Sequence, residues 1–494
     1  MHDCKLKPYT LRNRLVSKSP FKTLKNAKRA LQAFRLGKSI GFTAKASLKS
    51  MGVLPRSSGC YELGQKYAVG GMRTRKHVVR EKEKQQFGEV FTPEPIIDEM
   101  LASLPSSVWS NPDLAWLDPS CGYGNFPMKI IHGGKGYPGL FQGLSSVLPN
   151  VEKRKLHILS MLTCYDINKK SIAIFRRTLA EFCKGLPNVY AADFLAEPIS
   201  ERFDIVVTNP PYNAGGTKRV GEKRLHIRFA EKSLGLLHEG GRLLFVCPPN
   251  YRQAGSTMNA LFLNKGSFEY IRILGPEETL KIFHIQSRVD IFLFHLGGKG
   301  KTFIVDEYGF KSRLLLDFGR HIPNFGHSIF DKIRQIGIAK IDAFRTAEGT
   351  TIGCKNFGSG FPTIHLIVAE GRRVLRRRKH SLYGVPKLLL NGLGVPYVFH
   401  DVDGSYGVTQ TPVVVARPSA ALVAFTQTKL FYFLVWALRL TGNNNLPYVF
   451  SEIPADFGAG LRLTNAEQSL VDSFRVPVYA DKDLPTICGL SKAV

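Results

Sequence analysis

The stretch DIVVTNPPYN, Asp204–Asn213, joins a strand-like run to a rigid corner. Residues 205–208 are Ile, Val, Val and Thr, the β-branched types that favour a strand. Two prolines then end the strand, because neither can donate a hydrogen bond to a sheet ladder. We call residues 209–212, Asn-Pro-Pro-Tyr, the NPPY corner. The pattern predicts a buried strand that presents one amide and one aromatic ring in a fixed orientation.

The composition limits the class of protein. The chain has 494 residues, 44% of them hydrophobic, which is enough for two or three domains with their own cores. Its 8 cysteines form no Cys-x-x-Cys pair, and we expect reduced thiols and no metal site. The start of the chain lacks the apolar run of a signal peptide, and the most apolar stretch, residues 430–438, is too short to span a bilayer. We therefore expect an intracellular protein, in a bacterial cytoplasm or an infected host cell, that is not secreted and has no membrane partner.

The charge indicates a polyanionic partner. The formal net charge is +29, and residues 1–80 hold 19 lysines and arginines against two acids, Asp3 and Glu62. A strongly basic arm on a moderately basic body is typical of proteins that bind nucleic acid. The alternative is a solvated basic tail that aids solubility.

Three parts follow from the pattern along the chain. Residues 1–80 are a basic N-terminal arm, in which residues 22–38 have the amphipathic spacing of a helix. Residues 73–84 are a charged run that reads as a linker. In residues 81–300, predicted strands alternate with helices, and the strands fall at residues 116–119, 162–168, 189–195, 203–212, 240–251 and 289–296. This alternation predicts an open, mostly parallel α/β sheet, and residues 301–494 read as a separate α+β domain.

Two glycines follow the first predicted strand, in LDPSCGYGNF, Leu117–Phe126. Gly122 and Gly124 lack Cβ atoms, so the backbone can curl tightly and approach a ligand. The helix that follows would direct free N–H groups at that ligand. By itself the motif is also compatible with a plain loop.

Acidic residues follow the next two strands. Asp166, in CYDIN, can accept hydrogen bonds from both hydroxyls of a ribose, or it can serve the turn before a helix. Asp193, in ADFL, can accept from an adenine amino group, or it can be a turn residue. Because ligands of open α/β sheets bind at the carboxyl ends of the strands, the ordered series of motifs predicts a nucleotide-like ligand.

The NPPY corner ends the fourth strand of this series and has its own chemistry. The side-chain oxygen of Asn209 and the carbonyl of Pro210 are two acceptors, and Tyr212 offers a ring for stacking. This set suits a planar amine such as N6 of adenine, whose lone pair is delocalised into the ring. Accepting both amine hydrogens would localise the lone pair, so that a methyl group could transfer from a sulfonium without metal or covalent intermediate.

The motifs DPSCGYGNF, YDIN, DFL and NPPY, in this order, resemble those of the gamma-type adenine-N6 DNA methyltransferases of restriction–modification systems. FGEVFTPEPIIDEML, Phe87–Leu101, resembles the segment before the first glycine motif of that family, and Phe229–Tyr251 resembles the region after its catalytic motif. The resemblance covers residues 85–296 and is looser from about residue 300. It implies a class I S-adenosylmethionine-dependent methyltransferase, with a Rossmann-like, mostly parallel seven-stranded sheet and a C-terminal α+β target-recognition domain.

The resemblance implies a role for each matching residue. Asp166 would hold the ribose of S-adenosylmethionine, and Asp193 with Phe194 would hold its adenine. The full set expected to hold this cofactor is Thr92, Pro93, Asp118, Pro119, Gly122, Gly124, Phe126, Asp166, Asp193 and Phe194. The catalytic set is Asn209, Pro210, Pro211 and Tyr212. Phe283 is a candidate second ring against the target base, or else a core phenylalanine.

The family's substrate is double-stranded DNA, from which the target base must be flipped out. In RRVLRRRKH, residues 372–380, the side chains Arg376, Arg377 and Arg378 are candidate DNA contacts, with a solvated helix face as the alternative. We expect a monomer that modifies DNA and whose endonuclease, where one exists, is a separate protein.

Related chemistry leaves other substrates open. Glutamine-N5 protein methyltransferases and some RNA methyltransferases carry a similar motif, and N4-cytosine DNA methyltransferases usually have Ser in place of Asn209. A nucleic-acid-binding scaffold that has lost activity and a fused methylase–nuclease are further alternatives. The intact NPPY corner argues against the first of these, and the lack of an Asp…Glu-x-Lys cluster argues against the second.

Overall fold

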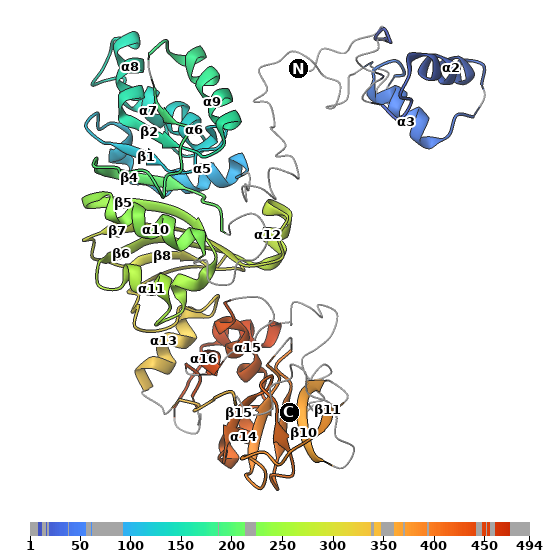
Figure 1. The fold of residues 1–494 in the computed structure, drawn as a ribbon, viewed down its shortest axis with the longest axis vertical. Helices are drawn as coiled ribbons and strands as arrows, with labels where there is room; N and C mark the ends of the chain where they lie inside the picture. Colours follow the sequence, from blue (N-terminus) through green and yellow to red (C-terminus); the bar gives the residue numbers. More distant parts are fainter. Residues whose placement is uncertain are drawn as a thin grey trace. The chain divides into compact units, whose positions relative to one another are not determined.

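The computed structural model describes residues 8–11, 16, 19–37, 39–55, 61, 92–185, 187–212, 224–336, 340–346, 360–368, 371–392, 395–440, 447–450, 452–454 and 460–474. The chain divides into two compact units, Met1–Val78 and Val79–Val494 (Figure 1). The expected linker at residues 73–84 and the segment at residues 87–91 lie outside the described residues. No helix within the described ranges has both the length and the hydropathy needed to cross a membrane.

The described part of the first unit contains helices α2 and α3. These are α2 Leu24–Arg35 and α3 Phe42–Ser50, and α2 confirms the helix predicted within residues 22–38. The Thr23 side chain accepts a hydrogen bond from the Asn26 backbone N–H and so caps α2. A small core lies beneath the helices and includes Val16, Ala27, Leu48, Met51, Val53 and Leu54.

The second unit contains a large mixed sheet. Among the described residues it has nine strands, in the order β3-β2-β1-β4-β5-β7-β6-β8-β9. Strands β3, β2, β1, β4 and β5 pair in parallel, whereas β7 is antiparallel to both β5 and β6. The strands are β1 Trp116–Asp118, β2 Leu162–Tyr165, β3 Asn188–Tyr190, β4 Phe203–Thr208, β5 Leu237–Cys247, β6 Gly266–Leu274, β7 Val289–Leu296, β8 Thr302–Val305 and β9 Lys311–Leu314. The first seven strands confirm the predicted fold class.

Helices connect these strands and cover the sheet. They are α5 Glu94–Ala102, α6 Asn125–His132, α7 Gly139–Gly143, α8 Val151–Met161, α9 Lys169–Phe182, α10 Leu225–Gly235, α11 Thr257–Phe262 and α12 Pro276–Phe283. Two 3-10 turns, η1 Ser106–Trp109 and η2 Pro249–Arg252, accompany them.

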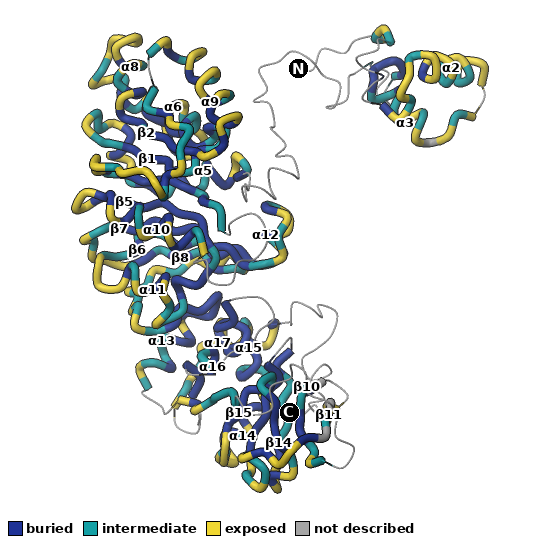
Figure 2. Tube along the Cα trace, in the orientation of Figure 1, coloured by how far each residue is buried: buried dark blue, intermediate teal, exposed yellow. Residues whose placement is uncertain are grey.

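Both faces of the sheet are buried, because alternate residues of a strand point to opposite faces. On β4, Ile205 and Val207 join a core that contains residues of α5, α6 and α9, whereas Val206 joins a core with residues of α10 and α11. Figure 2 shows the strands as a buried layer. A sheet covered on both faces leaves the ends of its strands for ligands.

The rest of the second unit is α+β, as expected. Its described residues include α13 His327–Ile336 and two three-stranded sheets, ordered β11-β10-β14 and β13-β12-β15. Their strands are β10 Phe361–Val368, β11 Gly371–Arg377, β12 Lys387–Leu390, β13 Val398–Asp401, β14 Gly407–Val408 and β15 Val413–Ala416. The helices α14 Ala420–Phe425, α15 Lys429–Leu438, α16 Pro447–Phe450 and α17 Asn465–Ser473 follow (Figure 1).

Two features differ from the sequence predictions. The main sheet continues past residue 300 through β8 and β9, so residues 302–314 belong to it. Much of the basic run at residues 372–380 lies in β11, an edge strand paired antiparallel with β10, so the helix alternative is wrong. Basic and apolar residues alternate only weakly in this run, so its periodicity does not indicate a strand. Because β11 lies at the edge of its sheet, it can carry charged side chains on its solvent side.

A buried polar cluster joins the main sheet to the C-terminal region. The guanidinium of Arg252 pairs with Asp290 on β7, with Nε 2.6 Å from Oδ2, and both side chains are fully buried. Arg252 also donates to the Asn324 side chain at 2.9 Å. The Asn324 Nδ2 in turn donates to the carbonyl of Arg439, just after α15, at 2.8 Å. Because a buried charge needs its partner, this cluster fixes how the two regions pack.

Replacing Asp290 tests the cluster. Asp290→Asn keeps the shape of the side chain but leaves the buried Arg252 charge without its counter-charge. We expect a loss of about 3–5 kcal/mol of unfolding free energy, measured from the urea midpoint by tryptophan fluorescence. In the matched control, Asp317→Asn removes an exposed partner of Arg320 at 3.5 Å, and the change is expected to stay below about 1 kcal/mol. Equal effects of the two variants would contradict the assignment.

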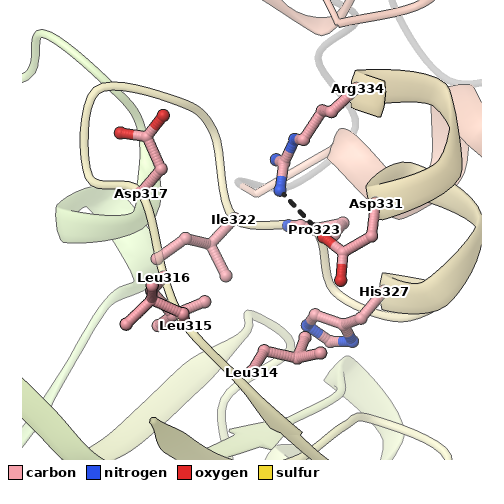
Figure 3. A pocket seen from close by; sticks show the side chains of 9 residues that line it. All are labelled: Leu314, Leu315, Leu316, Asp317, Ile322, Pro323, His327, Asp331 and Arg334. Carbon is pink, nitrogen blue, oxygen red and sulfur yellow. Dashed lines mark ion pairs between the residues drawn. The ribbon is translucent and has the colours of Figure 1, made fainter. Parts of the chain in front are cut away.

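A small cavity lies where α13 faces the loop after β9. Figure 3 shows His327, Asp331 and Arg334 of α13 on one side, and Leu314 at the end of β9 with loop residues such as Ile322 on the other. The cavity has room for about one water molecule. His327 is 6% exposed, and its Nε2 has no hydrogen-bond partner among the residues that the structure describes. Burial, together with the charges of Arg252 and Arg334, lowers the pKa of His327 to about 3.

This depressed pKa predicts acid sensitivity. The unfolded chain binds a proton at this histidine near pH 6.5, whereas the folded protein does so only near pH 3. Stability from neutral His327 is therefore present above about pH 6.5 and is lost at about 1 kcal/mol per pH unit as the pH falls. His327→Gln is expected to flatten that slope in urea titrations between pH 4 and 6.5, whereas His238→Gln, at an exposed position, is not. An unchanged slope in His327→Gln would sink the idea.

Candidate active site

The NPPY corner directly follows β4 and is oriented by a distant residue. The Asn209 Nδ2 donates to Thr92 Oγ1 at 2.8 Å. The other amide atom, Oδ1, is buried and has no partner within the described part of the chain. Thr92 is itself buried, just before α5. The contact thus holds the amide so that its acceptor oxygen is left for a ligand.

Both ends of the corner are anchored to the protein. At its start, Ser120 Oγ lies 2.6 Å from Thr208 Oγ1 and donates to the Asn209 carbonyl at 3.4 Å. At its end, the Tyr212 carbonyl accepts from the Leu225 backbone N–H at 3.2 Å. The His226 ring nitrogen Nδ1 lies 3.3 Å from the same carbonyl. Burial lowers the pKa of His226, so the neutral ring uses its Nδ1–H for this contact.

The glycine stretch after β1 folds over the end of β2. The Cys121 N–H donates to the Tyr165 carbonyl at 2.9 Å, and the Gly122 N–H donates to Asp166 Oδ2 at 2.8 Å. Gly122 and Gly124 have φ angles of 52° and 86°, in the left-handed region that favours glycine. Gly124 is the N-cap of α6, so the loop delivers the helix N-terminus to the strand ends.

Two carboxylates lie beneath this loop. Asp118 accepts from the Ser120 N–H at 3.1 Å through Oδ1, while its buried Oδ2 has no partner among the described residues. Burial raises its pKa well above the ordinary value, and the charge of Asp166 adds to this. Burial also raises the pKa of Asp166, although hydrogen bonds from Asn168 and Gly122 oppose the shift. Asp118 and Asp166 thus bring carboxyl groups together at the ends of β1 and β2.

The third strand end differs from the expected arrangement. Asp193 is exposed, and its Oδ1 accepts from the Leu195 N–H at 3.0 Å. Phe194 is only 2% exposed and packs with Tyr165 and Phe229 in the core beside α10. The carboxylate of Asp193 is therefore accessible to a ligand. The ring of Phe194 has almost no exposed surface and packs in the core next to the end of the strand.

The structure fits a bound S-adenosylmethionine in three respects. A Cβ added at Gly122 would meet no atom of the described residues within 4 Å, so these residues leave space over the backbone there. The buried Asp118 Oδ2 has no hydrogen-bond partner among the residues that the structure describes. Ile167, directly after Asp166, is 56% exposed although it is large and apolar. Ile167 was not among the site residues predicted from the sequence. The pattern that could have indicated it is an apolar residue between two polar ones in YDIN.

The remaining predicted residues take different positions. Tyr212 is half-buried, packs against the core and meets the His226 ring edge-on at 5.9 Å; burial raises its pKa. Phe283 is 5% exposed within the same core, which agrees with its alternative reading as a core residue. Phe126, Pro119 and Pro210 are buried supports, while Pro93 is the N-cap of α5 and Pro211 is half-buried.

The arginine candidates are divided by burial. Arg377 is 8% exposed and Arg378 is exposed, so only the latter presents its charge freely to solvent. The backbone of Arg376 lies in β11 and pairs with Pro362, and its side chain is outside the described atoms. Across the described residues, no group of three His, Cys, Asp or Glu side chains is arranged to hold a metal ion.

The two glycines provide a matched test of the loop. In Gly124→Ala, the new Cβ would lie 2.0 Å from the ring of Phe175, so we expect a stability loss of about 1–3 kcal/mol. In Gly122→Ala, no such clash exists. That variant is expected to lose only about 1 kcal/mol, from the strain of alanine at a left-handed φ without a clash, and to bind S-adenosylmethionine about tenfold more weakly, because its methyl group lies where the ligand approaches. Thermal unfolding and calorimetric titration measure the two effects, and the reverse pattern would contradict this loop assignment.

Comparisons with known proteins agree with the fold. Residues 147–271 match the family model of the methyltransferase small domain. The type II methyltransferase M.XhoI of Xanthomonas vasicola is 27% identical over 187 residues, which is 32% of this chain and 33% of that protein. An uncharacterized adenine-specific methylase of Mycoplasma pneumoniae is 38% identical over 95 residues, or 18% of this chain and 21% of its own. This chain thus matches about a third or less of the length of these relatives.

Matches among solved structures include the restriction–modification enzyme MmeI in complex with DNA, with a TM-score of 0.43 and 12% identity over 78% of this chain and 69% of that one. The M protein of the type I restriction enzyme EcoKI has a TM-score of 0.34 and 13% identity over 59% and 60%. With the strand order described above, the family and sequence matches confirm the predicted resemblance. The second unit therefore contains a class I S-adenosylmethionine-dependent methyltransferase domain related to the methyltransferases of restriction–modification systems.

Proposed function

We propose that this chain methylates N6 of a specific adenine in double-stranded DNA. The observation that carries the proposal is the Asn209 amide, whose nitrogen is held by Thr92 and whose buried oxygen has no partner within the described residues. A buried acceptor without a donor is costly unless a ligand completes it. An exocyclic amine of a flipped base supplies that donor. The name of the Mycoplasma relative, an adenine-specific methylase, supports the choice of base.

In the proposed reaction the protein prepares the nitrogen. Asn209 Oδ1 and the Pro210 carbonyl accept the two N6 hydrogens, which localises the lone pair on the nitrogen. The anchors at Ser120 and His226 keep these acceptors in place, so the protein does not reorganise as charge develops. Bound S-adenosylmethionine supplies an electrophilic methyl group. As the N6 lone pair forms the new N–CH3 bond, the methyl–sulfonium bond would break and leave S-adenosylhomocysteine. The methylated nitrogen then carries one positive charge, which the two acceptors stabilise until one N6 proton passes to solvent water.

Tyr212 has a different part in the proposal. Its ring is the candidate stacking surface for the flipped adenine. Burial raises its pKa, with further contributions from Cys247 and Asp290, so the phenol stays protonated at neutral pH and does not act as a base. Asn209 rather than Ser at the first position of the corner favours adenine over N4 of cytosine as the target.

The proposed cofactor residues surround the strand ends. Gly122, Gly124 and the start of α6 approach the methionine part together with Thr92 and Pro93. Asp166 faces the ribose while its hydrogen bond to Gly122 shapes the loop. In this proposal Asp193 and Ile167, both exposed, contact the adenine ring. Asp118 supplies the unused acceptor beneath them.

The proposed partner is duplex DNA. The net charge of +29 favours a polyanion, and relatives named as type II methyltransferases support DNA as that polyanion. The C-terminal α+β region then reads the target sequence, with the exposed Arg378 as a candidate phosphate contact. We assign any cleavage to a separate endonuclease, and we propose that the methyltransferase acts as a monomer.

Sequencing of modified DNA tests the function. The chain is expressed in cells that lack DNA methylation, and their genome is read by a method that distinguishes N6-methyladenine, N4-methylcytosine and unmodified bases. We expect N6-methyladenine at one recurring sequence. Asn209→Ala is expected to lower the methylation rate at least about 100-fold, the size of effect of a lost transition-state donor or acceptor, with calorimetric affinity for S-adenosylmethionine nearly unchanged.

Controls separate the competing readings. Thr92→Ser keeps the hydroxyl that orients Asn209 and is expected to retain most activity, whereas Thr92→Val is expected to lose much of it. Methylcytosine at the recurring site would move the substrate to N4 of cytosine. Unmodified DNA together with labelled protein glutamine or RNA from tritiated S-adenosylmethionine would refute a DNA substrate, and full activity in Asn209→Ala would remove that residue from the mechanism.

A further inference from the structure

The first unit, residues 1–78, is a folded module rather than a loose basic tail. Helix α2 has an N-cap at Thr23, and its Ala27 is fully buried against Leu48 and Met51 in a core of its own. The amine of Lys45, on α3, lies 5.4 Å from the centre of the Phe34 ring on α2. A module with a core can hold its charged side chains in a fixed pattern, which an unfolded tail cannot do.

The fixed pattern is a basic stripe along α2. Lys25, Lys28, Arg29 and Gln32 follow the spacing of one helix face, and all four are exposed, as is Arg35 one turn further. The opposite face, with Leu24, Ala27, Leu31 and Phe34, packs into the module core. Helix α2 is 12 residues long, so its stripe spans about 18 Å, roughly five base pairs of a duplex.

No acidic residue balances this stripe nearby in the described part of the module. Residues 1–78 contain two acids, Asp3 and Glu62, and both lie outside the described residues. The described part of the module contains seven lysines and arginines: Lys22, Lys25, Lys28, Arg29, Arg35, Lys45 and Lys49. Such a surface attracts phosphates strongly and repels other basic surfaces.

We propose that the exposed face of α2 is a second DNA-binding surface that grips the phosphate backbone without reading sequence. It acts as an anchor joined through the chain to the methyltransferase unit and keeps the enzyme on one DNA molecule between methylation events. The choice of duplex DNA as the partner rests on the proposed function. A lipid surface fits less well, because amphipathic helices insert their apolar face, and the apolar face of α2 is already used by the module core.

The physical consequence is a salt-dependent anchor. Each phosphate contact releases about one condensed counterion and steepens the dependence of log K on log salt by about 0.9. A tether also raises the effective concentration of the second site once the first is bound, so two weak contacts together slow release from DNA. Loss of the stripe is therefore expected to affect residence on DNA and not the chemical step.

The test compares two triple variants of the full-length protein. Lys25→Gln/Lys28→Gln/Arg29→Gln removes the stripe, and Lys135→Gln/Lys153→Gln/Lys299→Gln removes the same formal charge from exposed positions of the second unit. Binding to a random-sequence 30-base-pair duplex is measured by fluorescence anisotropy from 50 to 300 mM NaCl. We expect the stripe variant to bind at least about tenfold more weakly at 100 mM, with its salt slope reduced by about 2–3. The control variant is expected to change much less.

Methylation measurements separate the anchor from the chemistry. On a DNA with several copies of the target sequence, the stripe variant is expected to methylate fewer copies per encounter, while its single-turnover rate at saturating DNA stays that of the wild type. Equal weakening in both triple variants, or wild-type binding by the stripe variant, would overturn the proposal. So would tighter binding of the same stripe to phosphatidylserine vesicles than to the duplex.

The outcome also separates this proposal from the proposed function. If the wild type binds the duplex through the stripe but methylates no DNA, the anchor stands and the assigned substrate of the second unit is wrong. If the wild type methylates DNA, and the stripe variant equals the wild type in both DNA binding and methylation, the assigned function stands and the anchor is wrong. Circular dichroism of the stripe variant checks that α2 remains folded.

Discussion

Parallel pairing of β1 with β2 and with β4 is the constraint on which the site depends. Because parallel strands end at the same edge of the sheet, the pairing brings together motifs that are far apart in the sequence. Asp118 accepts from the turn after β1, that turn binds Asp166 after β2, and Ser120 reaches the start of the NPPY corner after β4. Hydrogen-bond acceptors and glycine backbone therefore lie close together at the edge of the sheet where the helices begin.

Local signals in the sequence predicted much of this arrangement. Apolar runs ended by Gly, Asp or Pro located β1, β2 and β4 within a few residues, because burial on both faces leaves such runs and turn chemistry ends them. The order of the motifs then predicted which side chains meet. Helix α2 was predicted from the spacing of its apolar residues, since a small module can bury only one face of each helix.

The parts that could not be predicted depend on contacts between distant residues. The amide of Asn209 is oriented by Thr92, 117 positions earlier, and no local pattern links them. Phe194 was expected to contact the adenine, and Phe283 read equally well as a ligand contact or as a core residue, but the packing around both rings buries them. The extension of the sheet by β8 and β9 and the strand conformation of β11 likewise depend on partners that periodicity does not reveal.

The same kind of distant contact connects the corner with the C-terminal region. His226 lies between the Tyr212 carbonyl and the side chain of Asn250, whose chain continues through η2 to Arg252. Arg252 pairs with Asp290 and holds Asn324, which binds the end of α15. Each of these groups is buried, so each needs its partner to avoid a desolvation cost. A chain of neighbouring polar contacts therefore runs from the NPPY corner through η2 and Asn324 to the end of α15.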